Sequence, residues 1–358
     1  MKGEKMRILA INPGSTSTKF AVFEDEKPLY HATIRHALSD LAHFPSVADQ
    51  YEYRKQLVLD ALAKEGIPLD FRAVVGRGGL LKPMPGGVFE VNERMCRDIR
   101  AAKRQHACNL GGLIAAELAA GIEGCHAYIA DAGVTDELDD IARVTGNPLF
   151  PKITIFHALN QKAVARRYAA SVGRRYEDMN LVVAHLGGGI SVGAHRQGRV
   201  VDVNNALDGS GPFSPERSGT IQAGELVNAC FSGRYTKEEV TSMIFGKGGL
   251  MSHFGTNDAK LLSERAKNGD RQVALVIDAM LYNVCKEIGA LCVALCGHVD
   301  AILLTGGIAY DKEWMAKITE RVQFLAPVHV YPGEDELEAL ALSGLRALRG
   351  EEEVQEYA

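Results

Sequence analysis

The sequence has no Cys-x-x-Cys pair, no excess of positive charge and no long apolar run. Its seven cysteines are scattered and odd in number, which favours buried free thiols over a disulfide framework. The 40 Lys and Arg residues against 45 Asp and Glu give a formal net charge of −5, the opposite of the balance in a basic nucleic-acid-binding protein. The most apolar long window, residues 288–299, is too short to span a bilayer.

These absences predict a protein that binds neither nucleic acid nor membrane. No signal peptide precedes the first apolar run, and together with the free thiols this favours a cytoplasmic location. The 358 residues are many for one core and suggest two domains. An apolar fraction of 46% and a charged fraction of 24% are ordinary for a globular chain.

What the sequence does contain is a turn rich in glycine and hydroxyl groups near its N-terminus. Residues 11–19 read INPGSTSTK and follow a short apolar run. A P-loop would have a second glycine and then a helix whose N-terminus faces the phosphates. Here that glycine is missing, and residues 20–23 and 29–34 have the pattern of two strands with a polar turn between them. The segment is therefore predicted to be the turn of a β-hairpin whose backbone N–H groups and hydroxyls face a phosphate.

A second hairpin of the same kind is predicted at residues 182–194. When the two segments are aligned, Gly14 matches Gly188 and Ser17 matches Ser191. Glycines in a single β-turn are common. Two such units far apart in one chain predict a duplicated α/β domain.

The last part of the chain has two further features. Residues 301–304 have the pattern of a buried strand that ends near a glycine pair, which lets a flat ligand approach the backbone. Residues 337–348 have the pattern of an amphipathic helix, with acidic residues at its start, where the helix dipole favours them. Helix capping alone would explain those acidic residues. The tail, residues 351–358, is expected to be frayed.

Four features follow one another along the chain: two phosphate hairpins, a strand ending in TGGIA and a closing helix with an acidic start. This order resembles that of the actin-like ATPase superfamily. Six segments resemble its acetokinase family, and the butyrate kinases in particular. They are NPGSTSTK, VVGRGG at 74–79, FHALNQKA at 156–163, AHLGGGISV at 184–192, SPERSG at 214–219 and LTGGIA at 304–309. The resemblance runs from residue 6 to about residue 348, and it is the conjunction of segments that is specific.

The resemblance implies an α/β protein with the duplicated two-domain actin-like ATPase fold of acetate kinases, sugar kinases, heat-shock ATPases and actin. Each domain would follow a ribonuclease H-like βββαβαβα pattern. Residues 1–145 and 336–358 would form the domain with the first phosphate loop and the acyl site. Residues 146–335 would form the domain with the second phosphate loop and the adenosine site. A homodimer or higher homo-oligomer is usual in the family.

The resemblance also implies reversible transfer of the γ-phosphoryl group of ATP to a short-chain carboxylate, giving an acyl phosphate and ADP by direct in-line transfer. Butyrate is the implied acid, and isobutyrate, valerate and propionate are alternatives that composition does not rank, because one methylene changes binding by only ~1–3 kcal/mol. Such an acid is ionised at neutral pH, so no general base is needed. The site should instead contain arginine, histidine, backbone amides and Mg²⁺ held by carboxylates.

Motif by motif, the resemblance assigns the catalytic residues. Arg217 matches an active-site arginine, and Arg77 is a second one, in a segment spaced differently from the family's HRVVHGG. His157 matches the histidine that contacts the transferring phosphoryl group, whereas Gln161 replaces the second histidine of the family's HGTSH. The other catalytic residues are Asp131 and Asn12, and the metal-linked residues are Glu336 and Asp131, with Asp335 as the alternative register for Glu336.

The nucleotide-binding residues implied by the resemblance belong to the two phosphate loops, the ribose side and the TGGIA turn. They are Ser15, Ser17, Lys19, His185, Gly187, Gly188, Gly189, Asp258, Gly306, Gly307 and Ile308. Where acetate kinases have Phe-Arg after the ribose-side aspartate, this chain has Ala259 and Lys260. His106 resembles a family histidine near the acyl site, and the sequence weighs this role evenly against a structural one.

Two other functions are open at the level of sequence. An ATP-driven conformational protein on the same fold would need neither His157 nor two arginines beside its phosphate loops. A sugar kinase would need a carboxylate base beside the substrate hydroxyl, and no motif places one. The motifs therefore favour carboxylate phosphorylation over both alternatives.

Overall fold

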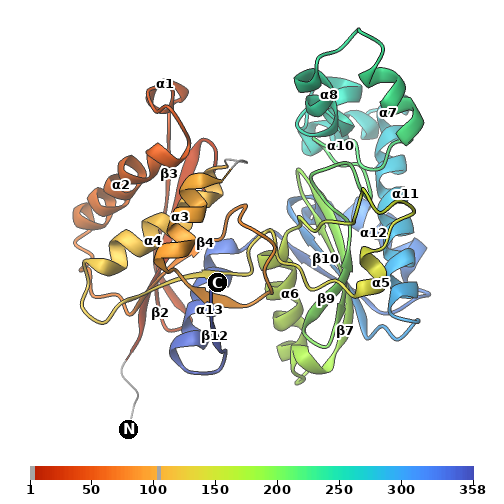
Figure 1. Cartoon of the computed structure of the whole chain (residues 1–358). Coiled ribbons are helices and arrows are strands. Elements are labelled where there is room, and N and C mark those ends of the chain that lie inside the picture. The colour runs from red at the N-terminus through yellow and green to blue at the C-terminus, as the bar shows by residue number, and fades with distance from the viewer. Residues whose placement is uncertain (1–4, 103–105) are drawn as a thin grey trace. The chain divides into compact units, whose positions relative to one another are not determined.

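The computed structural model describes residues 5–102 and 106–358, which form two compact units. Unit 1 comprises Met1–Thr135 and Asp335–Ala358, and unit 2 comprises Asp136–Glu334. The sequence suggested that the chain crosses after residues 145 and 335, whereas in this division it crosses after residues 135 and 334. Figure 1 follows the chain from red at its N-terminus to blue at its C-terminus, and each unit is described by itself.

Unit 1 contains a seven-stranded sheet with the order β12-β5-β6-β4-β1-β2-β3. The first three strands form an antiparallel meander, and β4 and β6 lie parallel to β1 on its other side. The strands are β1 (Arg7–Pro13), β2 (Ser17–Glu24), β3 (Lys27–Arg35), β4 (Ala73–Arg77), β5 (Val88–Glu90), β6 (His126–Ala130) and β12 (Val354–Glu356). The segment INPGSTSTK is thus the turn of a β-hairpin, and that prediction is confirmed.

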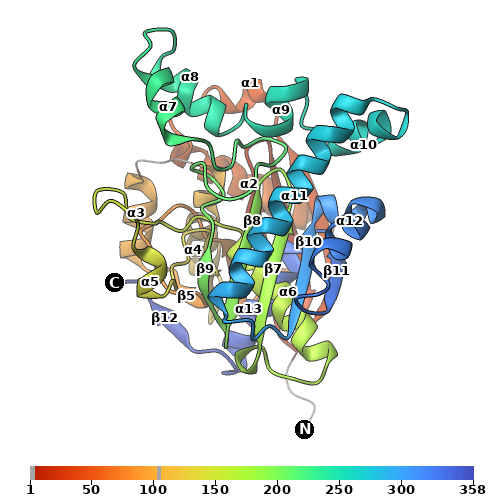
Figure 2. The same cartoon turned by 90° about the vertical axis from the view of Figure 1, so that its right-hand side faces the viewer.

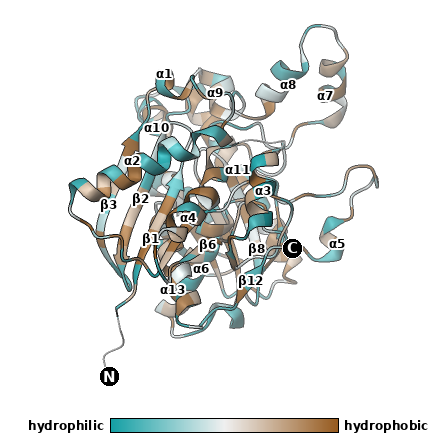
Figure 3. Ribbon diagram, turned by 60° about the vertical axis from the view of Figure 1, so that its left-hand side comes forward, coloured by the Kyte–Doolittle hydropathy of each residue, from teal (hydrophilic) through white to brown (hydrophobic). Residues whose placement is uncertain are grey.

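Helices cover both faces of the sheet of unit 1. Alternate residues of β1 point to opposite faces: Leu9 and Ile11 join the hydrophobic cluster with α2 and α4, whereas Ile8 faces α13 near Gly344. Figure 3 shows the apolar colour along the strands and the hydrophilic colour on the outer surface of α2. The helices of this unit are α1 (Leu38–Leu41), η1 (Ala48–Gln50), α2 (Tyr51–Lys64), α3 (Glu93–Ala101), η2 (Ala107–Asn109), α4 (Leu110–Ala120) and α13 (Glu336–Leu348).

Unit 2 contains a five-stranded sheet with the order β11-β10-β7-β8-β9. An antiparallel meander again comes first, and β10 and β11 lie parallel to β7 on the other side. The strands are β7 (Asn180–Leu186), β8 (Ile190–Arg196), β9 (Arg199–Val203), β10 (Ala301–Gly306) and β11 (Val328–Pro332). Read outward from the meander, β3-β2-β1-β4-β6 of unit 1 corresponds to β9-β8-β7-β10-β11, which confirms the predicted duplication.

The long helix α11 crosses one face of this second sheet, as Figure 2 shows. Val182 and Ala184 of β7 pack against that helix and α12, whereas Leu181 and Val183 pack against α6 on the opposite face. The helices are α5 (Asp140–Arg143), α6 (Ala158–Ser171), η3 (Tyr176–Asp178), α7 (Ala223–Cys230), α8 (Lys237–Ile244), α9 (Gly249–Phe254), α10 (Ala259–Lys267), α11 (Arg271–Ala294), η4 (Gly307–Tyr310) and α12 (Lys312–Val322). In residues 5–102 and 106–358, no helix combines the length and the apolar character that a membrane span requires.

The C-terminal tail is ordered, so the prediction that it is frayed was wrong. Strand β12 pairs in parallel with β5, which adds it to the sheet of unit 1. Tyr357 is 3% exposed, and its hydroxyl donates to Asp98 Oδ2 over 2.8 Å. Burial is the first cause that raises the pKa of the Tyr357 phenol, to about 12, and the bond to Asp98 adds to it. A buried aromatic ring and a strand pairing therefore hold a segment whose sequence looked like a polar tail.

Tyr357→Ala is expected to lower the free energy of unfolding by about 3 kcal/mol, because it removes a buried ring and leaves a cavity in the hydrophobic cluster of unit 1. Chemical denaturation of the full chain measures the change. Tyr310→Ala is the matched control, since Tyr310 is 70% exposed and its replacement should cost little. Equal stability of the two variants would show that the tail does not contribute to the fold of unit 1.

Candidate functional site

The turn between β1 and β2 is built around a buried arginine of α2. Arg54 is 0% exposed, and its guanidinium donates to the carbonyl oxygens of Gly14 at 2.8 Å, Ser17 at 3.1 Å and Ser15 at 3.2 Å. It also donates to the hydroxyl of Thr18 at 3.2 Å. The carbonyls of this turn are thereby held toward the interior of unit 1.

The same contacts decide where the amides of the turn point. In a planar trans peptide the N–H lies opposite the C=O, so the amides of Ser15 and Thr16 point away from Arg54. Burial lowers the pKa of the Arg54 guanidinium to about 10, which keeps it charged at neutral pH. Among the described contacts, the guanidinium of Arg54 donates to one side-chain amide, that of Gln50, at 2.9 Å. A buried cation thus shapes the turn so that its N–H groups can face an anion.

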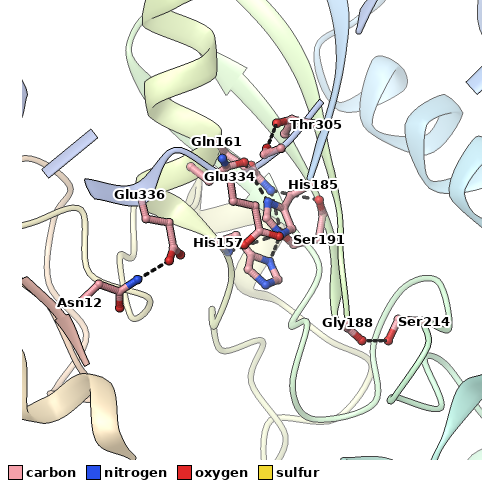
Figure 4. Close-up of polar contacts among 12 residues, drawn as sticks. Asn12, His157, Gln161, His185, Gly188, Ser191, Ser214, Thr305, Glu334 and Glu336 are labelled. Atoms are coloured by element: carbon pink, nitrogen blue, oxygen red, sulfur yellow. Dashed lines mark hydrogen bonds and ion pairs between the residues drawn. The ribbon is translucent and has the colours of Figure 1, made fainter. Parts of the chain in front are cut away.

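Three of the expected site residues meet beside this turn. Asn12 is the last residue but one of β1, Arg77 ends β4 and Glu336 begins α13. The side-chain amide of Asn12 and the guanidinium of Arg77 each donate to one carboxylate oxygen of Glu336. Figure 4 shows the contact between Asn12 and Glu336. Lys19 lies opposite Asn12 in the neighbouring strand and is exposed.

Glycines let the segment around Arg77 pack closely. A Cβ at Gly76 would lie 2.0 Å from the carbonyl oxygen of Gly111 in α4, and a Cβ at Gly79 would lie 2.4 Å from Cα of Asn109. Residues 76–79 therefore lie against the start of α4 without side chains in between. His106 precedes η2, the short helix before α4, and caps it: Nδ1 of His106 accepts from the backbone N–H of Cys108 at 3.2 Å.

Asp131 is anchored in a turn at the end of β6. It is 3% exposed, and its backbone φ of 39° lies in the left-handed region, which non-glycine residues seldom adopt. Its carboxylate accepts from the N–H of Gly87 at 2.8 Å, and its own N–H donates to the carbonyl of Gly87 at 3.0 Å. These two bonds hold Asp131 to the start of β5.

The second phosphate loop, residues 187–189, joins β7 to β8 and lies under an arginine. A Cβ at Gly189 would lie 1.7 Å from Nη1 of Arg217, so only glycine leaves room for the guanidinium. Arg217 donates to the carbonyl of Ala206 at 2.7 Å and lies 5.3 Å from the centre of the Phe245 ring. Its Nε is buried and has no hydrogen-bond partner in the described part of the chain.

The segment that carries Arg217 is bonded to this loop by its own polar groups. The hydroxyl of Ser214 donates to the carbonyl of Gly188 at 2.7 Å, and the N–H of Glu216 donates to the same oxygen at 3.2 Å. Burial is the main cause that lowers the pKa of Arg217, and the nearby carboxylates of Glu216 and Asp208 act in the opposite direction. Arg217 is therefore a poorly solvated cation fixed beside a turn of three glycines.

Two stacked histidines lie next to the second loop. The rings of His157 and His185 have centroids 3.8 Å apart and planes inclined by 11°. His185 is 1% exposed, and its Nδ1 lies 2.8 Å from Asn160 Oδ1. Its Nε2 lies 3.2 Å from Oε1 of Glu334, a residue that also approaches Gly187 (Figure 4).

The TGGIA turn lies against the end of β7. Gly306 has a φ of 96°, and a Cβ there would lie 2.3 Å from the carbonyl oxygen of Leu186. Gly306 and Gly333 exchange two backbone hydrogen bonds of 3.1 and 3.0 Å. A Cβ at Gly307 would meet no atom within 4 Å, whereas Ile308 is 7% exposed and belongs to the core. Gly307 is thus the member of this turn that offers open backbone to a ligand.

Asp258 is the N-cap of α10. Its carboxylate accepts from the N–H of Leu261 at 3.0 Å, and the residue is exposed. The preceding Asn257 donates to Oε1 of Glu216 at 2.5 Å, which connects this segment to the one that carries Arg217. The capping bond gives Asp258 a structural role whether or not it also binds a ribose.

Comparison with known proteins decides the family. Residues 154–333 match the acetokinase family. A protein of Bacteroides thetaiotaomicron named probable butyrate kinase is 57% identical over 352 residues, which cover 98% of this chain and 100% of that protein. The chain belongs to the acetokinase family.

Two further relatives of this acetokinase-family chain extend the comparison. Butyrate kinase 1 of Clostridium acetobutylicum is 52% identical over 353 residues, covering 98% of this chain and 99% of that protein. Among solved structures, the acetate kinase of Porphyromonas gingivalis has a TM-score of 0.78 at 19% identity and covers 96% of this chain and 100% of its own. The expected fold is therefore confirmed.

Sequence reasoning missed one residue beside the phosphate loop of each unit of this acetokinase-family chain. Arg54 lies in a helix of mixed polarity, where an arginine is normally predicted to be exposed. The sequence therefore did not indicate that this residue is buried. Glu334 stands in the GEDEL segment, but the motif drew attention to Glu336 two residues later. The structure gives these acids different partners: Glu334 contacts His185 of unit 2, and Glu336 contacts Asn12 and Arg77 of unit 1.

The residues present fit a magnesium ion that is held mainly by phosphates. Within residues 5–102 and 106–358, no group of three or more His, Cys, Asp or Glu side chains could hold a metal on its own. Mg²⁺ bound to a nucleotide needs only one or two protein carboxylates, with phosphates and waters as its other ligands. Glu336 meets this need because its carboxylate lies beside the first phosphate turn and is 15% exposed.

Proposed function

We propose that this protein is a butyrate kinase, which transfers the γ-phosphoryl group of ATP reversibly to the carboxylate of butyrate or a related short-chain acid. The observation that carries the proposal is identity of 52–57% to proteins named as butyrate kinases, over 98% of the chain. The products are an acyl phosphate and ADP. The chain is thus a phosphotransferase with a carboxyl group as acceptor.

The chemistry asks little of the protein in making bonds. A short fatty acid has a pKa like that of a side-chain carboxyl, so it is an anion at neutral pH and needs no general base. One carboxylate oxygen forms a bond to the γ-phosphorus, and the bond from that phosphorus to the β–γ bridging oxygen breaks. The electron pair of the broken bond leaves with ADP. The protein must bring two anions together and stabilise charge on the equatorial oxygens.

The residues of unit 2 are assigned to the phosphoryl group. Arg217 supplies a poorly solvated cation whose Nε has no protein partner among the described residues, which supports a role toward phosphate oxygens. The amides of residues 187–189 form the second phosphate loop, and His185 lies at its start. His157 is assigned as a hydrogen-bond donor to the transferring group.

The residues of unit 1 are assigned to the other phosphates and to the acid. The nucleotide phosphates are proposed to be bound by residues in and beside the first turn, whose amides point away from Arg54. These residues are Asn12, Ser15, Ser17 and Lys19. Arg77 is assigned to the carboxylate of the acid, and its ion pair with the carboxylate of Glu336 supports this role. His106 is proposed to border the acyl site, since Asn109 of the same short segment bonds to the backbone N–H of Leu80.

The remaining residues are assigned to the adenosine and to the metal ion. Gly306, Gly307 and Ile308 are assigned to adenine and Asp258 to the ribose, with the open backbone at Gly307 as support. Mg²⁺, when bound with ATP, supplies positive charge to the phosphate oxygens. Glu336 is proposed to hold it, with Asp131 as the second carboxylate.

Hydroxylamine trapping tests the function directly. With Mg-ATP and acids of two to six carbons, straight and branched, we expect hydroxamate formation that is greatest at four carbons, because the relatives at 52–57% identity are named butyrate kinases. Neighbouring chain lengths should react more weakly, since one methylene changes binding by only ~1–3 kcal/mol. Incubation without acid is the control and should give no hydroxamate. Binding of ATP without hydroxamate from any acid would refute the proposal and favour an ATP-driven conformational protein.

A further inference from the structure

A row of buried polar side chains runs away from His157 through the interior of unit 2. Alternate residues of β8 face the helix α6, so Ser191, Gly193 and His195 share one face of the strand. On the helix side, His157 and Gln161 are four residues apart and therefore lie on one face. The two faces meet, and Tyr176 of η3 closes the row (Figure 4 shows its inner part).

The orientation of the Gln161 amide follows from a backbone contact. Nε2 of Gln161 lies 3.0 Å from the carbonyl oxygen of Ser191 and 2.8 Å from the hydroxyl of the same residue. A carbonyl oxygen can only accept, so the NH₂ group of Gln161 faces Ser191. Its Oε1 then faces His195 Nε2 at 3.0 Å, which makes that nitrogen a donor.

The hydroxyl of Ser191 has its proton directed by these neighbours. Its oxygen accepts from Nε2 of Gln161, and the backbone N–H of His157 approaches it at 3.4 Å. A hydroxyl that accepts in this way has one proton to donate. Nδ1 of His157 lies 2.9 Å away and is placed to accept it. With the bond in that direction, the proton of a neutral His157 ring is on Nε2.

The outer end of the row supports the same pattern. With its proton on Nε2, the neutral ring of His195 accepts at Nδ1, where the hydroxyl of Tyr176 lies 2.7 Å away. Gln161 and His195 are both 0% exposed, and Tyr176 is 3% exposed. Water therefore has little opportunity to substitute for any of these three side chains. A Cβ at residue 193 would lie 2.4 Å from Gln161 Oε1, so Gly193 leaves the space that the contact with His195 needs.

The stacked partner of His157 favours the neutral form as well. Two imidazolium rings at a centroid distance of 3.8 Å would repel each other, which disfavours a charge on both rings at once. The carboxylate of Glu334 lies 3.2 Å from Nε2 of His185.

We propose that Gln161 is a positioning residue that fixes His157 as the neutral tautomer protonated on Nε2, with His195 and Tyr176 holding Gln161 in register. The catalytic use of that proton rests on the proposed function, because an Nε2–H can donate to a phosphoryl oxygen whereas the other tautomer would present a lone pair to it. Gln161 acts through Ser191 and does not itself touch the phosphoryl group. It occupies the place of a motif histidine, and the amide is suited to this task because it has a donor end and an acceptor end.

Nitrogen-15 NMR of the histidine rings tests the tautomer without any assay of activity. In the full-length protein with ring-labelled histidine, assigned by comparison with His157→Asn, we expect His157 to show a protonated Nε2 and an unprotonated Nδ1 near neutral pH. In Gln161→Met, which keeps the volume but removes the amide, we expect a mixture of the two neutral tautomers. A His157 signal that is the same in Gln161→Met and in the unchanged protein would overturn the proposal.

A milder pair of variants covers the case in which Gln161→Met does not fold. Tyr176→Phe removes one hydroxyl at the outer end of the row, and Tyr168→Phe is its matched control. Tyr168 is a tyrosine of similar burial, 7% exposed, whose ring lies near His329 instead. We expect the His157 tautomer ratio to shift in Tyr176→Phe only, and an equal response of both variants would count against the row.

Kinetics adds a second readout in the same variants. Gln161→Met is expected to lower kcat by about 100-fold with little change in KM for ATP, since one donor to the transferring group is misdirected. Tyr176→Phe should lower kcat about fivefold, as for one neutral hydrogen bond. If no acid is phosphorylated by the unchanged protein, the proposed function fails, while the NMR result still decides the tautomer.

Discussion

Arg217→Ala is expected to lower kcat for acyl phosphate formation by at least about 1,000-fold, the effect of removing an arginine that stabilises charge on a phosphoryl group in flight. The guanidinium lies directly over Gly189 and is desolvated, so its field acts through little water. Because Arg217 has no carboxylate bonded to it among the described contacts, its loss strands no buried anion. Hydroxamate formation from butyrate measures the change.

Two further variants separate the charge of Arg217 from its position. Gly189→Ala keeps the arginine but places a methyl group where its Nη1 now lies, so it should displace the guanidinium and lower kcat nearly as much. Arg234→Ala is the matched control, because Arg234 is exposed on unit 2 and its replacement should leave kcat unchanged. If Gly189→Ala retained full activity while Arg217→Ala lost it, the close packing over the loop would not matter for catalysis.

The hairpins and the duplicated order of strands could be predicted because both depend on short stretches of local sequence. Alternation of apolar residues sets which face of a strand is buried, and a glycine turn between two such runs sets the pairing. The turn of residues 11–19 and the loop of residues 187–189 each lie within one hairpin. Their shared pattern was therefore visible without any knowledge of distant contacts.

The rest of the site depends on contacts between residues far apart in the chain. Arg77 and Glu336 are separated by 259 positions, and nothing in either segment indicates that they form an ion pair. Gln161 could be seen as a departure from a motif, but its bonds to Ser191 and His195 follow only from the way α6 packs on β8. The prediction of a frayed tail was wrong for the same reason, since β12 pairs with β5, a strand far away from it in the sequence.

Arg54→Met is expected to lower the free energy of unfolding of the full chain by about 5 kcal/mol, because it leaves four buried or partly buried acceptors without this donor at ~1–3 kcal/mol each. The affected groups are the carbonyls of Gly14, Ser15 and Ser17 and the amide oxygen of Gln50. Methionine fills much of the space with an apolar chain, so the loss reports hydrogen bonds more than a cavity. Chemical denaturation measures it, with Arg97→Met on the surface of α3 as the matched control, expected to lie within about 0.5 kcal/mol of the unchanged protein.

The same variant should also weaken nucleotide binding, because the carbonyls that Arg54 now holds inward would be free to turn, and the amides of Ser15 and Thr16 would no longer be directed outward. We expect KM for ATP to rise at least tenfold at a temperature where the protein is still folded, with a smaller effect on KM for the acid. Arg54→Lys separates the two roles of the residue: it keeps the charge but has three donors in place of five. Partial recovery of stability with poor ATP binding in that variant would assign the shape of the turn to the fork of the guanidinium, whereas unchanged ATP binding in Arg54→Met would show that the turn holds its shape without it.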